Sequence, residues 1–220
     1  MIQSKSSVVV ASENGHPLSP GVSHDRHFAG LYQRLLAMRN GDARLPQAIG
    51  VTGCEREAGA TTVAIRLAAC AARLGGGPAL LVDANLTHPA IARMFGVAAE
   101  PGWFEVMSGT MESGQCIRAT PCEGLSLLTA GCSASGIEPV YVPAALAELV
   151  VLLKHDFATI VFDLPAAAAD GAAGVVCSAL DGVLVVVRAN RTIDELAHRA
   201  KRRLEEAHAS VWGVVLNYGA

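Results

Sequence analysis

Apolar and polar positions follow two different periods along this chain, and from Gln47 onward the two periods take turns. Short, nearly continuous apolar runs predict strands at 48–52, 79–83, 125–129, 158–163, 182–188 and 211–216. Between them, apolar residues at helical spacing predict helices at roughly 61–74, 88–95, 143–155, 170–179 and 192–208. Runs such as 79–82 and 183–187 are apolar at every position, which is typical of parallel strands covered on both faces. The pattern therefore predicts an α/β fold with a doubly wound, mainly parallel sheet flanked by helices.

The N-terminal part of the chain follows a different pattern. Residues 1–24 are rich in Ser, Pro, Gly and His without sustained periodicity, and they predict a flexible tail whose run 8–10 is too short to predict a core strand. Residues 25–46 predict an N-terminal helix followed by a linker. Residues 47–220 then form the α/β domain, in which the segment 96–124 predicts only short helices joined by turns.

The connection after the first predicted strand has the pattern of a phosphate-binding loop without its lysine. Such a loop reads G-x-x-x-x-G-K-[ST]; its backbone N–H groups cradle the phosphates and its lysine neutralises the β- and γ-phosphates. Here Ala60 stands at the lysine position between Gly59 and Thr61, and Cys54 stands at the first glycine position. The frame of strand, loop and helix is present, but its main positive charge is missing. We therefore expect nucleotide to bind weakly or not at all.

Two further strand ends carry carboxylates. The predicted strands at 79–83 and 158–163 end in Asp83 and Asp163. Because the carboxyl ends of parallel strands meet at one edge of a sheet, we expect both side chains beside the loop. A carboxylate there reaches Mg²⁺, often through water, or orders an attacking water. Strand ends also carry polar caps without chemistry, so vestigial carboxylates are the alternative interpretation.

Charge and cysteine usage exclude several classes of protein. The 220 residues are 51% apolar with a net charge of −3, which gives no overall electrostatic reason to bind nucleic acid. The six cysteines form no C-x-x-C pair and have no zinc-site spacing, which is typical of reduced cytosolic thiols. The start of the chain has no apolar signal core, and no apolar run is long enough to span a bilayer. We therefore expect a cytoplasmic location.

Together, these motifs resemble the cytoplasmic ATP-binding domain of the bacterial tyrosine kinases of capsule and exopolysaccharide assembly. The loop at 56–62 corresponds to P-G-E-G-K-S-T of that family, the run at 80–89 to L-L-V-D-A-D-L-R-R-P, and the run at 160–166 to V-I-I-D-T-P-P. Further matches lie in the last two predicted strands, so that the resemblance extends over 47–217. It implies the P-loop NTPase-like version of the doubly wound fold.

The resemblance also implies a nucleotide and metal site. The implied cofactor-binding residues are Arg56, Gly59, Ala60, Thr61, Thr62 and Asn217. Mg²⁺ would be held by Thr61, Asp83 and Asp163, and the two aspartates would be the catalytic residues in a vestigial or weak form. Arg56 is a hypothetical substitute for the missing lysine, and Asn217 matches a residue near the base in relatives. The implied cofactor is ATP or ADP with Mg²⁺, and no cofactor at all is the alternative.

Departures from the family pattern fall on the same motifs. Besides Ala60, Glu57 stands at a glycine, Asn85 at the second aspartate of the second motif, and Thr87 at an arginine. The resemblance leaves enzymatic activity open, because the family are kinases and ATPases, but these departures favour a pseudoenzyme.

The expected function is that of a degenerate tyrosine-kinase-like protein that regulates polysaccharide biosynthesis or export. Its implied partner is an inner-membrane chain-length determinant or copolymerase protein, which would hold it at the membrane periphery. Homo-oligomers are also implied, and no nucleic acid. One alternative is an active ATP-dependent tyrosine autokinase of the same pathway, labelled on Tyr32, Tyr141 or Tyr218; the other is a partition- or division-site-like ATPase.

Overall fold

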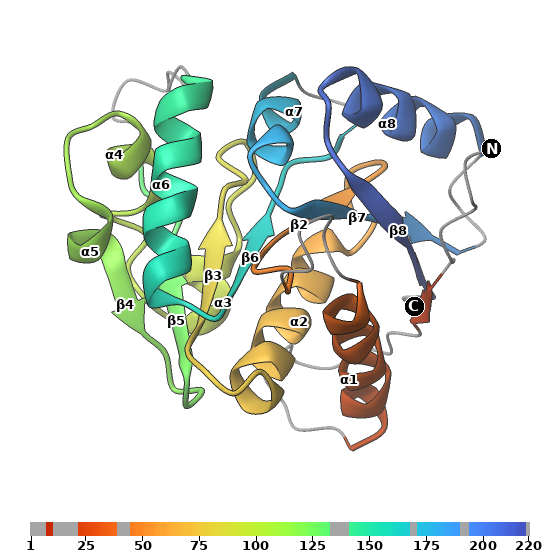
Figure 1. Ribbon diagram of the computed structural model, residues 1–220, viewed down its shortest axis with the longest axis horizontal. Coiled ribbons are helices and arrows are strands. Elements are labelled where there is room, and N and C mark those ends of the chain that lie inside the picture. Colours follow the sequence, from red (N-terminus) through yellow and green to blue (C-terminus); the bar gives the residue numbers. More distant parts are fainter. Residues whose placement is uncertain are drawn as a thin grey trace.

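The strands of this protein form one sheet with helices on both sides. A computed structural model describes residues 8–10, 22–38, 45–132, 141–167, 171–189 and 194–218. The strands are β1 (Val8–Val10), β2 (Ala48–Gly53), β3 (Ala79–Asp83), β4 (Ile117–Ala119), β5 (Leu125–Leu128), β6 (Thr159–Asp163), β7 (Gly182–Arg188) and β8 (Val211–Asn217). Their order in the sheet is β1-β8-β7-β2-β6-β3-β5-β4, and every neighbouring pair is parallel except β4 with β5 (Figure 1). The predicted doubly wound, mainly parallel sheet is therefore confirmed.

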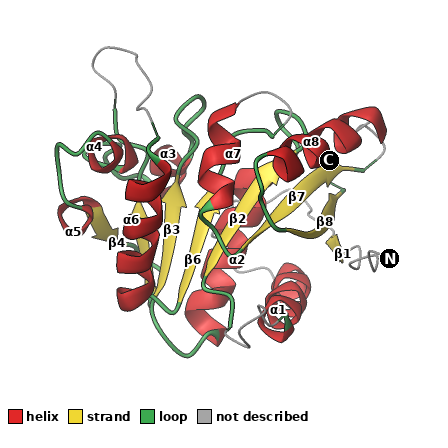
Figure 2. Cartoon of the chain, turned by 45° about the horizontal axis from the view of Figure 1, so that its top comes forward, coloured by secondary structure: helices red, strands yellow, loops and turns green. Residues whose placement is uncertain are grey.

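The helices divide between the two faces of the sheet. They are α1 (Val22–Ala37), α2 (Ala60–Leu74), α3 (Ile91–Phe95), α4 (Trp103–Met107), α5 (Ser113–Cys116), α6 (Pro143–Asp156), α7 (Gly171–Ser178) and α8 (Asp194–Glu206). The helices α1 and α2 lie on one face, and α6, α7 and α8 cover the other (Figure 2). Successive strand residues alternate between the two cores: Leu81 and Val161 pack toward α2, whereas Leu80 and Ile160 pack toward α6. Both faces are buried, which explains the uninterrupted apolar runs in the sequence.

The strand β1 lies in the segment that was predicted to be a flexible tail, and that prediction is wrong for these residues. β1 pairs in parallel with β8, with Val8 opposite Val215 and Val10 opposite Asn217. Three valines have no period of their own, so only a partner near the other end of the chain makes them a strand. The next helix begins at Val22, upstream of the predicted boundary at residue 25.

Two further elements differ from the prediction. The helix predicted from residue 88 begins only at Ile91, because the preceding turn is held by Asp83 (described below). In the segment 96–124 the short helices α4 and α5 are confirmed, but β4 was not predicted. It has three residues and pairs antiparallel with β5, and so short a strand leaves little periodic signal.

The amino ends of the central strands are tied together by one carboxylate. The Oδ2 atom of Asp181 accepts hydrogen bonds from the backbone N–H groups of Gln47 and Ala48, both at 2.9 Å. Its Oδ1 atom lies 2.6 Å from Nζ of Lys154 on α6. Asp181 thus joins the start of β2, the start of β7 and one covering helix at the end of the sheet opposite the strand ends that carry Asp83 and Asp163.

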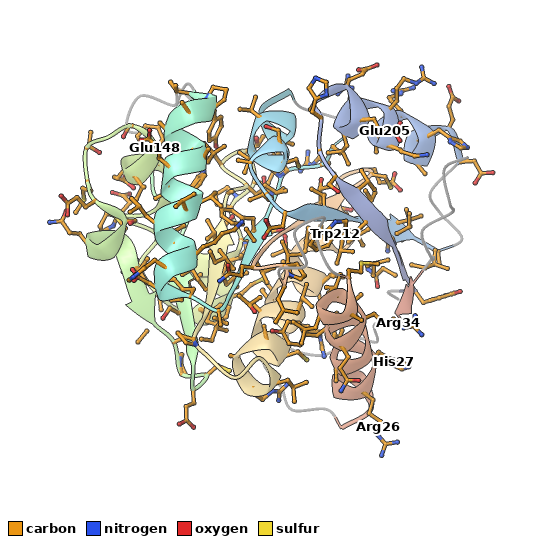
Figure 3. The ribbon with its side chains drawn as sticks, in the orientation of Figure 1. Arg26, His27, Arg34, Glu148, Glu205 and Trp212 are labelled. Atoms are coloured by element: carbon orange, nitrogen blue, oxygen red, sulfur yellow. The ribbon has the colours of Figure 1, made fainter. Side chains whose placement is uncertain are left out.

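The side chains on the outside of α1 are exposed, whereas Trp212 of β8 lies in the core. Arg26, His27 and Arg34 project from α1 away from the sheet (Figure 3). Trp212 is buried, and its indole fills the space above Gly182, where a Cβ atom would overlap the ring. Within the described ranges, the structure contains no helix with the length and apolar character that crossing a membrane requires.

Candidate functional site

The carboxyl ends of β2, β6 and β3 meet at one edge of the sheet, because these strands are parallel neighbours. In register, Asp163 is paired with Val51 on one side and with Asp83 on the other. A cleft of about 330 Å³ lies at this edge. Its lining comes from the loop after β2, the turn after β3 and the segment after β6, and consists of residues 53, 55–61, 85, 87–88 and 164–166.

The loop after β2 keeps the backbone shape of a phosphate-binding loop. Gly59 precedes α2 with φ 91° and ψ 17°, in the left-handed region. Glu57, which also stands at a family glycine, has φ 61°. A residue with a Cβ atom in this region costs about 1–2 kcal/mol relative to the ordinary conformation. The glycine-type backbone therefore persists at Glu57 at an energetic cost, and Ala60 begins α2 where the family has its lysine.

Hydrogen bonds join this loop to the segment after β6. The hydroxyl of Thr52 donates to the carbonyl oxygen of Pro165 at 2.6 Å, and the N–H of Ala167 donates to the carbonyl oxygen of Gly53 at 2.9 Å. The two segments therefore form one unit under the cleft. Thr52 was missed by the sequence analysis; the signal was a hydroxyl residue at the end of an otherwise apolar strand.

The carboxylate of Asp83 is used by the turn that follows it. Its Oδ1 accepts the N–H of Asn85 at 3.3 Å, and its Oδ2 accepts those of Ala90 at 3.3 Å and Ile91 at 3.1 Å. Burial raises the pKa of Asp83 to about 6, and these backbone hydrogen bonds oppose part of that rise. Asp83 thus fixes the turn and starts α3 while lying beside the cleft.

Unlike Asp83, Asp163 accepts no hydrogen bonds from the described backbone around it. Its side chain is 1% exposed, and neither carboxylate oxygen has a hydrogen-bond partner among the described residues. Burial, followed by the negative charge of Asp83, raises the pKa of Asp163 well above its ordinary value. The hydroxyl of Thr61 is near enough to oppose part of this rise, although it does not reach the geometry of a regular hydrogen bond. A buried carboxylate without partners destabilises a fold, so this position is suited to a cation that approaches from the Thr61 side.

The charges around the cleft are unfavourable for a triphosphate. Glu55 and Glu57 contribute two carboxylates to the lining, and Arg56 is the one permanently charged cation among the described lining residues. His88 lines the opposite wall. A nucleotide with three phosphates requires positive potential at the start of α2, whereas the lining has more negative than positive charges.

The structure brings most of the predicted site residues together. Those that line the cleft are Arg56, Gly59, Ala60 and Thr61. Thr62 follows on α2 and is not among the lining residues. Asn217 lies against the loop, with its Nδ2 atom 2.9 Å from the carbonyl oxygen of Ala58; a contact with a nucleotide base stays a prediction. Asn85, Thr87 and His88 were not predicted as site residues, although the first two were noted as departures from the family.

Known proteins with similar sequences carry kinase names. The chain is 26% identical over 168 residues to the putative tyrosine-protein kinase EpsB of Ralstonia solanacearum, a match that covers 76% of this chain and 22% of EpsB. It is 24% identical over 170 residues to the tyrosine-protein kinase CpsD of Streptococcus agalactiae, covering 77% of this chain and 74% of CpsD. The chain thus spans 22% of the length of EpsB. No protein-family model matches the chain.

Solved structures with the same fold include kinase domains. The chimerical protein CapA2B2 superposes with a TM-score of 0.84 at 22% identity, covering 96% of this chain and 93% of that one. The VpsO kinase domain gives a TM-score of 0.73 at 27% identity, covering 89% and 96%. The septum site-determining protein MinD of Pyrococcus horikoshii, complexed with Mg-ADP, gives 0.64 at 23% identity, covering 78% and 70%.

The fold and the cleft together define a P-loop NTPase-like α/β protein. Within that class, the relatives confirm the resemblance that the motifs predicted: the chain is similar in sequence to bacterial tyrosine-protein kinases such as EpsB and CpsD, and in fold to the VpsO kinase domain.

The residues present fit the metal ion and one phosphate of a magnesium–nucleotide complex, but they do not supply the cation that its terminal phosphates require. Mg²⁺ in such sites takes one or two carboxylates together with phosphate oxygens, and the orphaned oxygens of Asp163 beside Thr61 fit that demand. The left-handed Gly59 and the start of the long helix α2 fit a phosphate. The place for a cation on the terminal phosphates is taken by Ala60, which does not fit.

Proposed function

We propose that this protein is a degenerate member of its family, which binds Mg·nucleotide weakly or not at all and serves as a non-catalytic, regulatory partner in polysaccharide biosynthesis or export. The observation that carries the proposal is the make-up of the cleft. Ala60 stands where the terminal phosphates need an ammonium group, and Glu55 and Glu57 place two carboxylates nearby.

The size of the deficit supports weak binding. A charge-assisted hydrogen bond between lysine and phosphate contributes about 1.5–3 kcal/mol, so its loss weakens binding on the order of 10- to 100-fold. Phosphoryl transfer suffers further, because the charge that the lysine stabilises grows toward the transition state. The backbone of the loop and the two strand-end aspartates are retained, so the cleft itself persists and serves as a scaffold.

Equilibrium titration with Mg·ATP and Mg·ADP tests this proposal most directly. The parent protein, Ala60→Lys and Ala60→Met are compared, because methionine matches most of the length of lysine without its charge. We expect weak or undetectable binding by the parent and by Ala60→Met, and a gain in affinity of at least about tenfold for Ala60→Lys. Micromolar binding and turnover by the parent protein would contradict the proposal.

Arg56 is the residue to test for compensation. It lines the cleft, and a guanidinium group is able to hold phosphate oxygens in pairs. If Arg56 supplies part of the missing charge, Arg56→Ala lowers whatever residual nucleotide affinity the parent has. An Arg56→Ala protein that binds as well as the parent removes this role.

The partner in this proposal is an inner-membrane chain-length determinant or copolymerase protein, which would hold the chain at the cytoplasmic face of the membrane. The resemblance to the kinase family supports this partner. The chain keeps the sheet of the kinase-like fold but has Ala60 in place of the phosphate-binding lysine, which suits a protein that binds a partner without catalysis. Co-purification of the tagged protein with such a membrane protein, and altered polysaccharide on deletion, are the expected results. Absence of both would count against this role.

A second candidate function, an active tyrosine autokinase, is favoured by the retained Thr61, Asp83 and Asp163. The three tyrosines that could accept the phosphoryl group differ in how far they are exposed to solvent. Tyr32 is 1% exposed and its hydroxyl is hydrogen-bonded to Thr159 at 2.8 Å, so it is inaccessible, whereas Tyr218 is 48% exposed.

Labelling with radioactive ATP decides between the two functions. The autokinase predicts label on Tyr218, lost in Tyr218→Phe and in Asp83→Ala. The third candidate, Tyr141, is half-buried and accepts a hydrogen bond from Nε1 of Trp103 at 3.2 Å. No label in the parent protein supports the pseudoenzyme.

A further inference from the structure

One hydrogen bond joins the last described strand to the phosphate loop. The Nδ2 atom of Asn217 donates to the carbonyl oxygen of Ala58 at 2.9 Å, across 159 positions of sequence. Asn217 is 6% exposed, so the bond is shielded from water. The same Nδ2 atom lies so close to Gly59 that a Cβ atom there would overlap it. The side chain therefore touches both residues of the peptide that precedes α2.

The backbone that carries this side chain is firmly held. Asn217 ends β8, which lies between β1 and β7; it is opposite Val10 on one side and Arg188 on the other. Its own carbonyl oxygen accepts the N–H of Ala189 at 2.7 Å. Asn217 is thus a fixed point of the sheet, while the loop it touches is a connection with two residues in the left-handed region.

The geometry of the peptide makes the bond directional. In a trans peptide the C=O and N–H groups point in opposite directions. Holding the Ala58 carbonyl toward Asn217 therefore turns the N–H of Gly59 away from Asn217. It also fixes the plane in which Gly59 adopts φ 91°.

We propose that Asn217 is the positioning residue of the phosphate loop: its side-chain amide sets the Ala58–Gly59 peptide so that the Gly59 N–H is presented to an anionic ligand at the start of α2. The inference rests on the proposed function only for the nature of that ligand, a phosphate group. Asn217 acts through the loop, independently of any contact with a base.

The test exchanges the donor for an acceptor of the same shape. Asn217→Asp places a carboxylate oxygen against the Ala58 carbonyl, which repels it. Val215→Ala is the matched control, because Val215 is a fully buried residue of the same strand whose apolar side chain offers the loop no hydrogen bond. Amide hydrogen exchange of residues 54–61 is compared with that of β7 and β8 in all three proteins, without added nucleotide.

We expect exchange in the loop to rise about tenfold in Asn217→Asp relative to the rest of the sheet, as loss of one hydrogen bond predicts. Val215→Ala is expected to raise exchange in β8 without selectivity for the loop. When the introduced carboxyl is protonated in acid, it becomes a donor again, so the loop protection factors of this variant should return toward those of the parent at the same pH. A merely destabilised strand would show no such recovery.

Equal loop exchange in Asn217→Asp and the parent overturns the inference, and so does a rise that acid does not reverse. The second arm repeats Asn217→Asp in the Ala60→Lys background and measures Mg·ADP affinity, where we expect a loss of about tenfold. Unchanged affinity despite a loosened loop overturns the ligand-presenting role. If Ala60→Lys itself binds no nucleotide, the missing lysine is not the sole obstacle to binding and the ligand-presenting role is lost with it, while the exchange arm still decides whether Asn217 positions the loop.

Discussion

Two aspartates at opposite ends of the same sheet behave in opposite ways. Asp181, at the amino ends of the strands, has Lys154 at 2.6 Å and two backbone N–H donors at 2.9 Å. Burial raises its pKa, but Lys154 and the two backbone hydrogen bonds outweigh burial, so the pKa of Asp181 lies below its ordinary value. Asp163, at the carboxyl ends, is more deeply buried, has no hydrogen-bond partner among the described residues, and its pKa lies well above the ordinary value.

The difference separates a carboxylate that stabilises the fold from one that the described part of the fold leaves without a partner. An unpartnered buried polar group costs about 1–3 kcal/mol, and the fold tolerates this cost at the edge where the cleft lies. The same edge also carries Glu57 in the left-handed region. The edge with the cleft thus carries an unsatisfied carboxylate and a strained residue, although the Nε atom of Arg66 and the positive φ of His208 show that such features also occur elsewhere. At the amino-terminal edge, by contrast, both oxygens of Asp181 are bonded.

The largest effect is expected at the anchoring edge. Asp181→Ala removes the partner of Lys154 and of two backbone N–H groups, and should lower the free energy of unfolding by about 3 kcal/mol. Urea denaturation measures it. Glu148→Ala, an exposed change on the same helix as Lys154 (Figure 3), is the control and should change stability by less than about 0.5 kcal/mol. A similar small effect for both variants would remove the contrast.

The pH dependence of stability should show the opposite signs of the two sites. The folded protein holds protons on Asp83 and Asp163 where the unfolded chain has lost them, so stability falls as pH rises from 3.8 toward about 6 and beyond. Asp181 has a lowered pKa, so its contribution is present above 3.8 and is lost as pH falls. We expect the parent to lose about 2 kcal/mol of stability between about pH 5 and about pH 7, measured by urea denaturation. A stability that rises over that interval would contradict these assignments.

Replacing the unpartnered carboxylate should stabilise the protein. Asp163→Asn removes a carboxyl group that ionises freely in the unfolded chain but is costly to ionise in the folded protein, and should raise the free energy of unfolding by about 1–2 kcal/mol at neutral pH. The gain should shrink in acid, where the carboxyl of the parent is protonated, and thermal or urea unfolding at both pH values measures it. A loss of stability at neutral pH would mean that Asp163 has a stabilising partner.

The smallest effect tests the strain in the loop. Glu57→Gly should raise the free energy of unfolding by about 1 kcal/mol, because glycine adopts φ 61° without a Cβ penalty. Glu55→Gly makes the same change of charge at a neighbouring residue whose φ is not positive, and should be neutral or destabilising. If the two variants behave alike, charge rather than backbone strain is responsible.

Much of the fold was determined by local sequence. Parallel strands buried on both faces must be apolar throughout, so β3, β6 and β7 were predicted within one residue of their bounds. The convergence of Asp83 and Asp163 beside the loop followed from strand ends in a parallel sheet. The same argument placed Ala60 and Thr61 at the cleft, because the loop connects β2 to α2.

Other features depend on partners far away in sequence, and only the tertiary structure decided them. Val8–Val10 became a strand by pairing with β8, and Asn217 found its acceptor on Ala58. Whether a buried aspartate is satisfied, as Asp181 is, or left without a partner, as Asp163 is, depends on which donors the completed fold brings to it. The periodicity of a segment shows which of its faces are buried, because each strand or helix needs apolar residues on its own buried faces. Hydrogen-bond partners are set by the assembly of the whole sheet, so the sequence placed the site and the tertiary structure decided the state of its carboxylates.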